Sequence, residues 1–245
     1  MALAPIWVGT SGWSYPEWRE SFYAGVTRKD WLRHYARHFP AVEINATFYR
    51  MQQPATFARW RDETPPDFRF AIKANRYLTH IRTMRDPEPA VRVERECSAG
   101  LGEKLAVVLW QLPASLARTM DRLRHFAEVV SDWREVRHVL EFRHPSWFDE
   151  AVVDCLRAHR LAVCLSDAAD WPLWDAITTD LVYVRLHGRP RTYASAYSPE
   201  QIDGWAARAR AWLAEGRQVQ VYFDNTAEGN APRDALRLLR CFDAV

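Results

Sequence analysis

Short apolar runs alternate with longer amphipathic segments along the whole chain. Eight of the runs have the length and composition of β-strands, at residues 6–9, 42–45, 68–73, 105–112, 138–143, 161–165, 181–187 and 219–224. The segments between them have helical periodicity. This alternation of strand and helix, repeated about eight times, predicts an α/β fold with a parallel sheet.

Several of the helical segments carry a start signal or an apolar stripe. Thr27 and Asp30 fit a variant of the capping box that opens a helix, and Pro54 fits the first turn of the next one. Apolar stripes at helical spacing follow at residues 116–130, 202–212 and 235–242. Only the interval between Asp167 and Asp180 is too short for a full crossover helix, so we expect a short or irregular helix around residues 171–176.

The polar ends of the predicted strands distinguish a closed barrel from an open sheet. Polar triplets or pairs end six strands: Glu43-Ile44-Asn45, Lys73-Ala74-Asn75, Glu141-Phe142-Arg143, Leu165-Ser166-Asp167, Arg185-Leu186-His187 and Phe223-Asp224-Asn225. Residues i and i+2 of a strand share one face, so a polar–apolar–polar triplet aims two polar groups the same way. An open sheet places its ligand at one switch point between two strands. Endings spread over six strands therefore predict a TIM-like (β/α)8 parallel barrel, a single domain over residues 1–245, with a polar site at its C-terminal mouth.

Composition and charge exclude some classes of protein. A hydrophobic content of 48% and a charged content of 26% are typical of a globular domain, and a net charge of +2 favours neither nucleic acid nor membrane surfaces. The longest apolar run, residues 105–110, is far shorter than the ~20 residues of a membrane span. Cys97, Cys155, Cys164 and Cys241 form no CxxC pair, which is typical of reduced thiols. We therefore expect a cytoplasmic protein.

Glu43 and Glu141 are the first candidates for acid/base chemistry, because a partly desolvated mouth raises the pKa of a carboxyl group toward neutrality. If they face each other across the barrel, they suit a paired-carboxylate mechanism such as glycoside hydrolysis. The alternative is an ion-pair lattice in which Lys73, Arg143 and Arg185 neutralise them, and the sequence leaves both alternatives open.

Lys73 is unusual because only three of the 33 basic residues are lysines, which leaves thirty arginines. Lysine can lose its proton when buried, whereas arginine effectively cannot, so a lysine retained here indicates proton transfer or nucleophilic chemistry. A buried counter-ion is the alternative role.

Two kinds of ligand site can be drawn from the predicted loops. The residues available to a divalent metal are Glu43, Glu141, Asp167, Asp224, His80, His144 and His187. Hard ions accept such mixed ligands, but no local spacing supports the site, so the cofactor stays open. An anion site has more support: Arg189 and Arg191 follow the seventh strand, and Asn230 and Pro232 begin a helix after the eighth. Barrels bind phosphate with these two loops, although a solvated basic loop and an ordinary helix start explain the same residues.

The chain has twelve tryptophans, and five of them fall near the predicted mouth: Trp13, Trp18, Trp147, Trp171 and Trp174. Aromatic platforms beside arginine suit sugars or single-stranded bases, while packing under long loops is the simpler explanation. We expect Trp110, Trp205 and Trp212 in the core.

The motifs extend nearly from end to end: Gly9-Thr-Ser-Gly-Trp13-Ser-Tyr15, Val42-Glu-Ile-Asn45, Thr47-Phe-Tyr49, Phe70-Ala-Ile-Lys73, Leu109-Trp-Gln-Leu-Pro113, Glu141-Phe-Arg-His-Pro-Ser-Trp147, Tyr183-Val-Arg-Leu-His-Gly188 and Tyr222-Phe-Asp-Asn225. Together they resemble the domain of unknown function 72 family, the YecE-like proteins. The resemblance implies a TIM-like barrel and supplies no established activity. One departure is Asp234, where similar proteins usually carry Asn.

Our leading hypothesis is an enzyme that uses general acid/base chemistry on a small anionic, phosphorylated or sugar-like substrate, as a hydrolase, lyase or isomerase. Glu141 is the expected base, and Lys73, His80 or His187 the acid, with Glu43 as a further catalytic candidate. The expected substrate-binding residues are Asn45, Tyr49, Gln111, Arg143, Trp147, Arg185, Arg189, Asp224 and Asn225. The alternatives are a nucleic-acid-binding or nucleic-acid-processing protein, including a metal-dependent phosphodiesterase, and a barrel that serves only as a binding scaffold. The sequence leaves the substrate and the oligomeric state open.

Overall fold

Eight parallel strands form the ring that the sequence predicts. The computed structural model describes residues 6–242. The strands are β1 (Ile6–Thr10), β2 (Ala41–Ile44), β3 (Arg69–Lys73), β4 (Leu105–Gln111), β5 (Arg137–Glu141), β6 (Ala162–Asp167), β7 (Leu181–Leu186) and β8 (Gln218–Phe223). They are hydrogen-bonded in the order β1-β8-β7-β6-β5-β4-β3-β2, every pair parallel. One parallel bridge between Ser11 and Glu43 joins the two ends of this sheet, so the (β/α)8 barrel prediction is confirmed.

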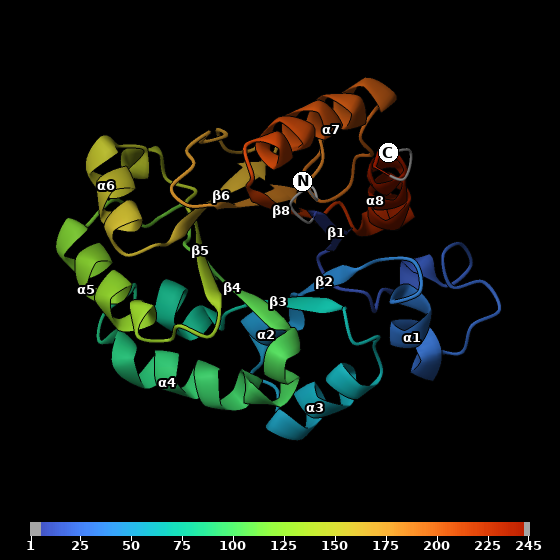
Figure 1. The fold of residues 1–245 in the computed structure, drawn as a ribbon, viewed down its shortest axis with the longest axis horizontal. Coiled ribbons are helices and arrows are strands. Elements are labelled where there is room, and N and C mark those ends of the chain that lie inside the picture. The colour runs from blue at the N-terminus through green and yellow to red at the C-terminus, as the bar shows by residue number, and fades with distance from the viewer. Residues whose placement is uncertain (1–5, 243–245) are drawn as a thin grey trace.

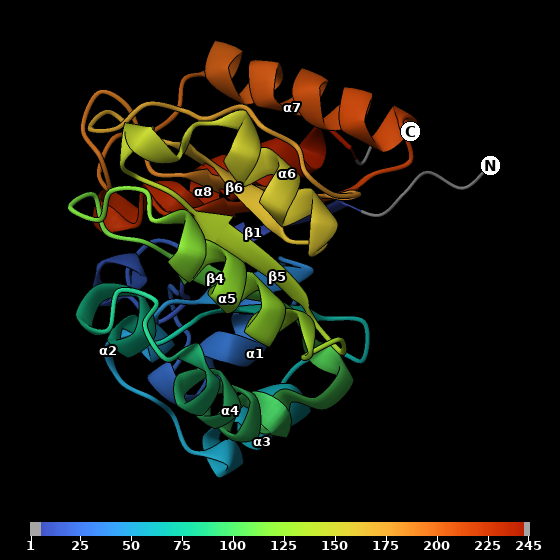
Figure 2. The ribbon, with the colours of Figure 1, turned by 90° about the vertical axis from the view of Figure 1, so that its left-hand side faces the viewer.

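Helices surround the strands on the outside (Figures 1 and 2). They are α1 (Trp31–Tyr35), α2 (Ala46–Tyr49), α3 (Pro54–Asp62), α4 (Pro87–Ser98), α5 (Met120–Ser131), α6 (Glu150–Ala158), α7 (Pro199–Ala214) and α8 (Asn230–Arg240). Short helical turns lie at Pro16–Trp18, Arg28–Asp30, Tyr77–Ile81, Ala99–Lys104, Pro145–Trp147 and Ala227–Gly229. The turn at Tyr77–Ile81 is a π-helix, a form that often occurs at functional sites.

Two separate apolar cores follow from the period-2 alternation of the strands. In β4, Val107 and Leu109 belong to a small cluster inside the barrel, whereas Val108 and Trp110 belong to the large cluster between strands and helices. The inner cluster is narrow, and two aromatic rings from β7 and β8 help to fill it. The polar ends of the inward-facing rows therefore lie above a filled barrel, not above a channel.

Residues 168–180, all of which are described, contain no helix, so the short helix expected around residues 171–176 is wrong. The reason is length. Thirteen residues of α-helix span only about 20 Å, which is roughly the length of β6 and leaves no residues for turns. The chain instead returns in an irregular path, and Thr178 fixes it to the start of β6 by donating to the Leu161 carbonyl at 2.6 Å and accepting from Val163 N at 3.2 Å.

The predicted helix starts are partly right. Pro54 is the first residue of α3, as predicted. Thr27 caps no backbone N–H; its hydroxyl donates to the Asp30 carboxylate instead, so the predicted capping box is wrong. Leu116 precedes α5, which begins only at Met120.

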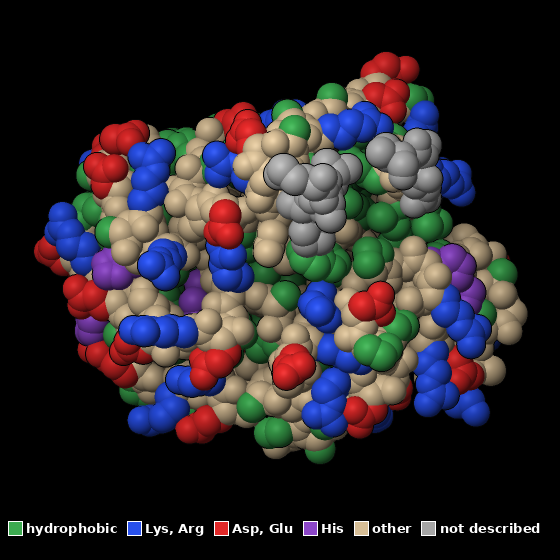
Figure 3. Space-filling view, in the orientation of Figure 1, with side chains coloured by type: hydrophobic (Ala, Val, Ile, Leu, Met, Phe, Trp, Pro, Cys, Tyr) green, Lys and Arg blue, Asp and Glu red, His purple; other side chains and the backbone are tan. Residues whose placement is uncertain are grey.

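The surface carries mixed charge. Figure 3 looks at the end of the barrel from which the strands start, and positive and negative side chains are interspersed over that face. Many pair with one another, for example Arg208 with Asp175 at 2.7 Å. In the part of the chain that the structure describes, no helix has the length and apolar character that a membrane span requires.

Candidate functional site

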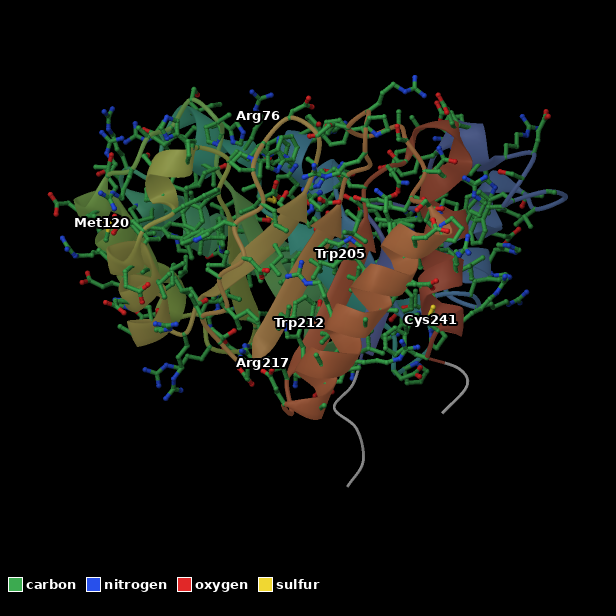
Figure 4. All side chains as sticks on the ribbon, turned by 90° about the horizontal axis from the view of Figure 1, so that it is seen from above. Arg76, Met120, Trp205, Trp212, Arg217 and Cys241 are labelled. Carbon is green, nitrogen blue, oxygen red and sulfur yellow. The ribbon has the colours of Figure 1, made fainter. Side chains whose placement is uncertain are left out.

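The candidate site lies at the end of the barrel where the strands finish. Figure 4 shows Arg76, which follows β3, and Arg217, which precedes β8, at opposite ends of the molecule. The mouth is the end marked by Arg76. The last inward-facing residue of each strand reaches this end, which is where barrels of this type place their active sites.

Arg185, from β7, is the centre of the site. It is fully buried, and its guanidinium donates to three carboxylates: to Glu43 at 2.8 Å, to Glu141 at 2.7 Å and to Asp224 at 2.9 Å. Burial alone would lower the pKa of this arginine, but the three carboxylates outweigh burial and raise it well above the ordinary value. Arg185 is therefore a permanent cation that holds the ends of β2, β5, β7 and β8 together.

Glu43 is buried and fully hydrogen-bonded. Besides Arg185, it accepts from the hydroxyls of Ser11 and Tyr183, both at 2.6 Å. Both oxygens of this carboxylate accept hydrogen bonds from described residues, so neither is available to a substrate. The geometry favours the ion-pair alternative for Glu43.

Glu141 is in a similar position. One oxygen accepts from Arg185, and the other accepts from Arg143 Nε at 2.9 Å and from Ser166 Oγ at 3.2 Å. Burial opposes its ionisation, but Arg185 and Arg143 outweigh burial and hold the pKa of Glu141 well below its ordinary value. A carboxylate with so low a pKa is a weak base, so the geometry favours the ion-pair alternative here too.

Asp224 and His187 are the less constrained members of the cluster. Asp224 uses one oxygen to accept from Arg185, and its other oxygen has no hydrogen bond with a described residue. Burial raises its pKa, against the opposing effect of Arg185. His187 Nε2 lies 2.9 Å from Arg185 Nη1 and therefore accepts, which places the ring proton on Nδ1. That buried Nδ1 has no partner, and burial together with Arg185 lowers the pKa of His187 well below its ordinary value, so the ring is neutral.

Lys73, at the end of β3, is buried but unpaired. It is 6% exposed, and its ammonium lies 4.0 Å from the ring centroid of Phe48. It forms no hydrogen bond or ion pair with a described residue, whereas Lys104, the comparable partly buried lysine, donates to three oxygens. Burial and the nearby Arg185 lower the pKa of Lys73 to about 8.

Arg143 and His80 complete the mouth. The Arg143 guanidinium stacks 4.0 Å from the ring centroid of Trp171 and donates through Nε to Glu141, and the Tyr193 hydroxyl is its other hydrogen-bonding neighbour. His80 packs edge-to-face on Phe48 and bonds to Thr79 at 2.9 Å. Burial, Arg76 and Lys73 lower the pKa of His80 to about 4, so this ring is also neutral near pH 7.

Other expected substrate-binding residues lie at the mouth with less definite roles. Asn45 immediately precedes α2, and its buried Oδ1 has no partner among the described residues. Gln111 is 3% exposed and donates to the Leu112 carbonyl at 2.7 Å. Tyr49 is at the end of α2 and is 67% exposed.

Three expected binding residues are engaged elsewhere. Trp147 is fully buried and donates to the Leu116 carbonyl at 2.7 Å, so a substrate cannot reach it and that expectation needs correction. Arg189 donates to Asp167 at 2.7 Å, and Asn225 donates outward to Asp234 at 2.8 Å. Asp234, the departure noted in the sequence, is buried and also accepts from Tyr197 N at 2.9 Å, so it anchors the loop after β7.

The residues proposed for a metal are divided between the cluster around Arg185 and other surroundings. Among residues 6–242, no group of three or more His, Cys, Asp and Glu side chains is placed to hold a metal ion. Arg185 occupies the space between the carboxylates of the cluster. Asp167 faces outward, where it accepts from the hydroxyl of Tyr197 at 2.8 Å, and His144 bonds to Ser146.

The predicted anion loops are also internally paired. Arg189 binds Asp167, and Arg191 binds Glu228 at 3.3 Å. Gly229 is the residue that caps α8, while the Asn230 side chain donates to the Ala194 carbonyl, so the predicted Asn230 cap is wrong. Pro232 does lie in the first turn of that helix.

Most of the loop tryptophans are packing residues. Trp18 is fully buried, Trp13 packs edge-to-face on Trp60, and Trp174 stacks on Phe148. Of the core set, Trp110 and Trp212 are buried and Trp205 is partly buried against the outer core. Trp171, against Arg143, is the one member of the loop group in contact with the described cluster.

Sequence reasoning missed three residues that hold the carboxylates: Ser11, Ser166 and Tyr183. The signal was present in the period of 2. Tyr183 is two residues before Arg185, so it faces inward as well. Successive residues of a strand face opposite sides, so Ser166 faces inward and its neighbour Asp167 faces outward. The prediction placed Asp167 at the mouth, whereas the inward-facing residue of β6 is the one before it.

The fold and the site define a (β/α)8 barrel whose mouth is a carboxylate cluster built around one buried arginine. The chain belongs to the family described as "Protein of unknown function DUF72", whose family model matches residues 7–244. The resemblance drawn from the strand-end motifs is confirmed.

Two curated proteins and one solved structure are similar to the chain. UPF0759 protein YecE of Escherichia coli (strain K12) is 33% identical over 144 residues, which make up 58% of this chain and 50% of YecE, so the match spans about half of that relative. UPF0759 protein YunF of Bacillus subtilis (strain 168) is 24% identical over 97% of this chain and 95% of its own. The crystal structure of a DUF72 family protein from Thermotoga maritima MSB8 has a TM-score of 0.87 at 26% identity and covers 97% of this chain.

Proposed function

We propose that this protein is an enzyme that transfers protons to and from a small anionic substrate bound at the mouth of the barrel. The observation that carries the proposal is Lys73: a buried lysine that forms no ion pair with any residue from 6 to 242 and has a pKa of about 8. Burying an unpaired ammonium is costly, and residues with such perturbed pKa values are concentrated at functional sites. A pKa near 8 suits a group that both gives and takes a proton near neutral pH.

Asp224 is the partner that we assign to Lys73 in this chemistry. The charges of the two groups influence each other's pKa, and the second oxygen of Asp224 accepts no hydrogen bond from the part of the chain that the structure describes. Burial raises the pKa of Asp224, so it too can change protonation more readily than an ordinary carboxylate. Glu141, the base expected from the sequence, has both oxygens engaged, so we assign it to the framework that holds Arg185 and Arg143.

Arg143 is the residue that we expect to bind the negative charge of the substrate. Its terminal nitrogens form no ion pair with a described carboxylate, and the stack on Trp171 orients the plane of the guanidinium. An oriented guanidinium binds carboxylate or phosphate with two parallel hydrogen bonds. Neutral His80 lies near it and supplies a further hydrogen-bonding group, whereas neutral His187 is fully buried.

The nucleic-acid alternative gains no support from the site. It required a surface of arginine and tryptophan, but Trp18 and Trp147 are fully buried and Arg189 is paired with Asp167. We therefore propose no second function.

The first experiment measures ligand binding and proton transfer together. Inorganic phosphate, sugar phosphates and 2-oxo acids are screened by thermal shift, since a ligand at ~100 times its Kd stabilises by ~2.7 kcal/mol. Compounds that bind are then incubated in D2O, and deuterium incorporation is followed by NMR. We expect at least one anionic compound to bind, and K73M to lose about 100-fold or more of its exchange rate.

Two variants serve as comparisons. K29M removes an exposed lysine and the same charge, so its exchange rate should match that of the unaltered protein. R143M should lose binding of the anion. Retention of the full exchange rate in K73M, or the absence of any anion-dependent thermal shift, would refute the proposal.

A further inference from the structure

A second cavity lies outside the barrel, between α4 and the segment that follows β3. Its volume is about 280 Å3, close to the lower end of small-molecule pockets. Its lining is mostly apolar and includes Leu78, Val93 and Trp110. Val93 and Tyr77, which also line it, are 43% and 51% exposed, so the cavity opens to solvent on their side.

One polar group in this lining is unsatisfied. Glu94, on α4, is 2% exposed, and its Oε2 accepts from the backbone N–H of Asn75 at 3.0 Å. Its Oε1 is buried in the same lining and has no hydrogen-bond partner among the described residues. Asn75, which also lines the cavity, has both side-chain amide atoms engaged, with Thr47 and Tyr77.

A water molecule is a poor partner for Glu94 Oε1. A buried water needs two to four polar partners, and Glu94 Oε1 is the one open buried side-chain atom that the described lining offers. An apolar molecule alone would fill the space but leave the oxygen unpaired, which is costly for a buried acceptor. A suitable occupant therefore joins an apolar body to a hydrogen-bond donor.

We propose that this cavity binds a small primary ammonium ion with an apolar body, its ammonium on Glu94 and its body against Leu78, Val93 and Trp110. An ionised carboxylate only accepts hydrogen bonds, so the donor-only ammonium group is its direct complement. The aromatic rings in the lining also favour a cation over a neutral head group.

The charge state of Glu94 makes this binding dependent on pH. Burial raises the pKa of Glu94 to about 7, and the Asn75 amide acts in the opposite direction. The neighbouring titratable groups are Cys97, on the same helix, whose pKa is itself raised by burial, and Tyr77, which lines the cavity from the segment after β3. An ammonium binds the ionised form, so affinity rises as pH increases through 7, by about tenfold between pH 6 and pH 8.

The site is separate from the mouth, although the two share a segment. Lys73 faces inward at the end of β3, whereas Asn75, Tyr77 and Leu78 turn outward to the cavity. The same π-helix, Tyr77–Ile81, carries His80 to the mouth. The inference does not depend on the proposed function, because it uses no residue of the proton-transfer site.

Binding is measured by NMR titration of the full chain with phenethylamine, and with phenethyl alcohol as the neutral analogue, at pH 6, 7 and 8. The amine should bind, with the tenfold rise in affinity, and the alcohol should show no such rise. E94Q should weaken amine binding at pH 8 at least tenfold and remove the pH dependence. E96Q, at an exposed glutamate of the same helix, should behave like the unaltered protein.

A second variant keeps the test decisive if E94Q does not fold. A90F places a large side chain in the lining and keeps Glu94, so it should abolish binding of the amine. Equal binding of amine and alcohol at every pH, no binding of either, or unchanged binding in A90F would overturn the inference.

Discussion

Replacing Arg185 by methionine tests whether the centre of the mouth is an ion-pair framework. Methionine keeps much of the length of the side chain and removes the charge that three buried carboxylates share. Breaking a buried ion pair by removing one partner costs about 3–5 kcal/mol, and here three acids lose their cation. That loss is a large fraction of a typical stability of about 5–15 kcal/mol. For a domain of this size it corresponds to a fall in Tm of about 6–20 °C.

The pH dependence gives the sharper test. In the unaltered protein the folded pKa of Glu141 is depressed, so the stabilisation is present above the unfolded carboxyl pKa of ~4.3 and is lost as pH falls through the folded pKa. In R185M, burial without Arg185 raises the pKa of Glu141 and further raises that of Asp224. Their protonation then favours the folded state, so R185M should gain more stability than the unaltered protein as pH falls from 7 to 5, because Glu141 contributes no such gain while Arg185 is present.

The assay is urea unfolding followed by far-UV circular dichroism at pH 7, 6 and 5. R191M removes an exposed arginine that pairs with Glu228 and should stay within about 1 kcal/mol of the unaltered protein. If R185M does not fold at pH 7, refolding at pH 5 provides the same comparison. A loss below about 1 kcal/mol at pH 7, or a stability that falls on acidification in parallel with the unaltered protein, refutes the framework.

Three further predictions concern single buried groups. E141Q should lower the free energy of unfolding by about 2–3 kcal/mol, because it removes charge from hydrogen bonds to two arginines; a urea titration showing a loss under about 0.5 kcal/mol would contradict this. K73M should raise the free energy of unfolding at pH 7 by about 3 kcal/mol, because the folded pKa of Lys73, about 8, lies below the unfolded value of ~10.4. The gain should shrink as pH rises from 8 to 10.5. A gain that does not change with pH would show that the buried charge of Lys73 is not its cause. Burial lowers the pKa of His138 to about 4, so the free energy of unfolding of the unaltered protein should fall by about 3 kcal/mol between pH 6.5 and pH 4 through this group, and H138F should lack that fall. Denaturation curves that show the same loss of stability in both proteins over this pH range would refute the prediction.

The period of 2 in the strands was sufficient to predict the barrel and most of its inward-facing polar residues. Glu43, Lys73, Glu141 and Arg185 all lie at the mouth because each is an inward position at the end of its strand. Where the prediction was wrong, the error was one of register: a strand can end with its acidic residue on the outer face, as Asp167 does.

Contacts between strands that are not neighbours could not be predicted in this way. The sequence places Arg185 and Glu43 142 residues apart, and only the stagger of the closed ring decides that their side chains meet. The burial of Trp147 is of the same kind, since it depends on the 31-residue separation from the Leu116 carbonyl that it contacts. No helix forms between β6 and β7 because the connecting segment is too short, and the short interval between Asp167 and Asp180 was already visible in the sequence.

The reach of Arg185 across the ring has a consequence for the order of folding. Its partners lie on β2, β5 and β8, and Glu43, on β2, reaches Arg185 only when the two ends of the sheet join. Before closure this ion pair is absent, so the cluster is incomplete and the pair contributes little to the barrier for folding. Interactions that form after the transition state slow unfolding and leave the folding rate nearly unchanged. We therefore expect the completed cluster to prolong the lifetime of the closed barrel without accelerating its formation.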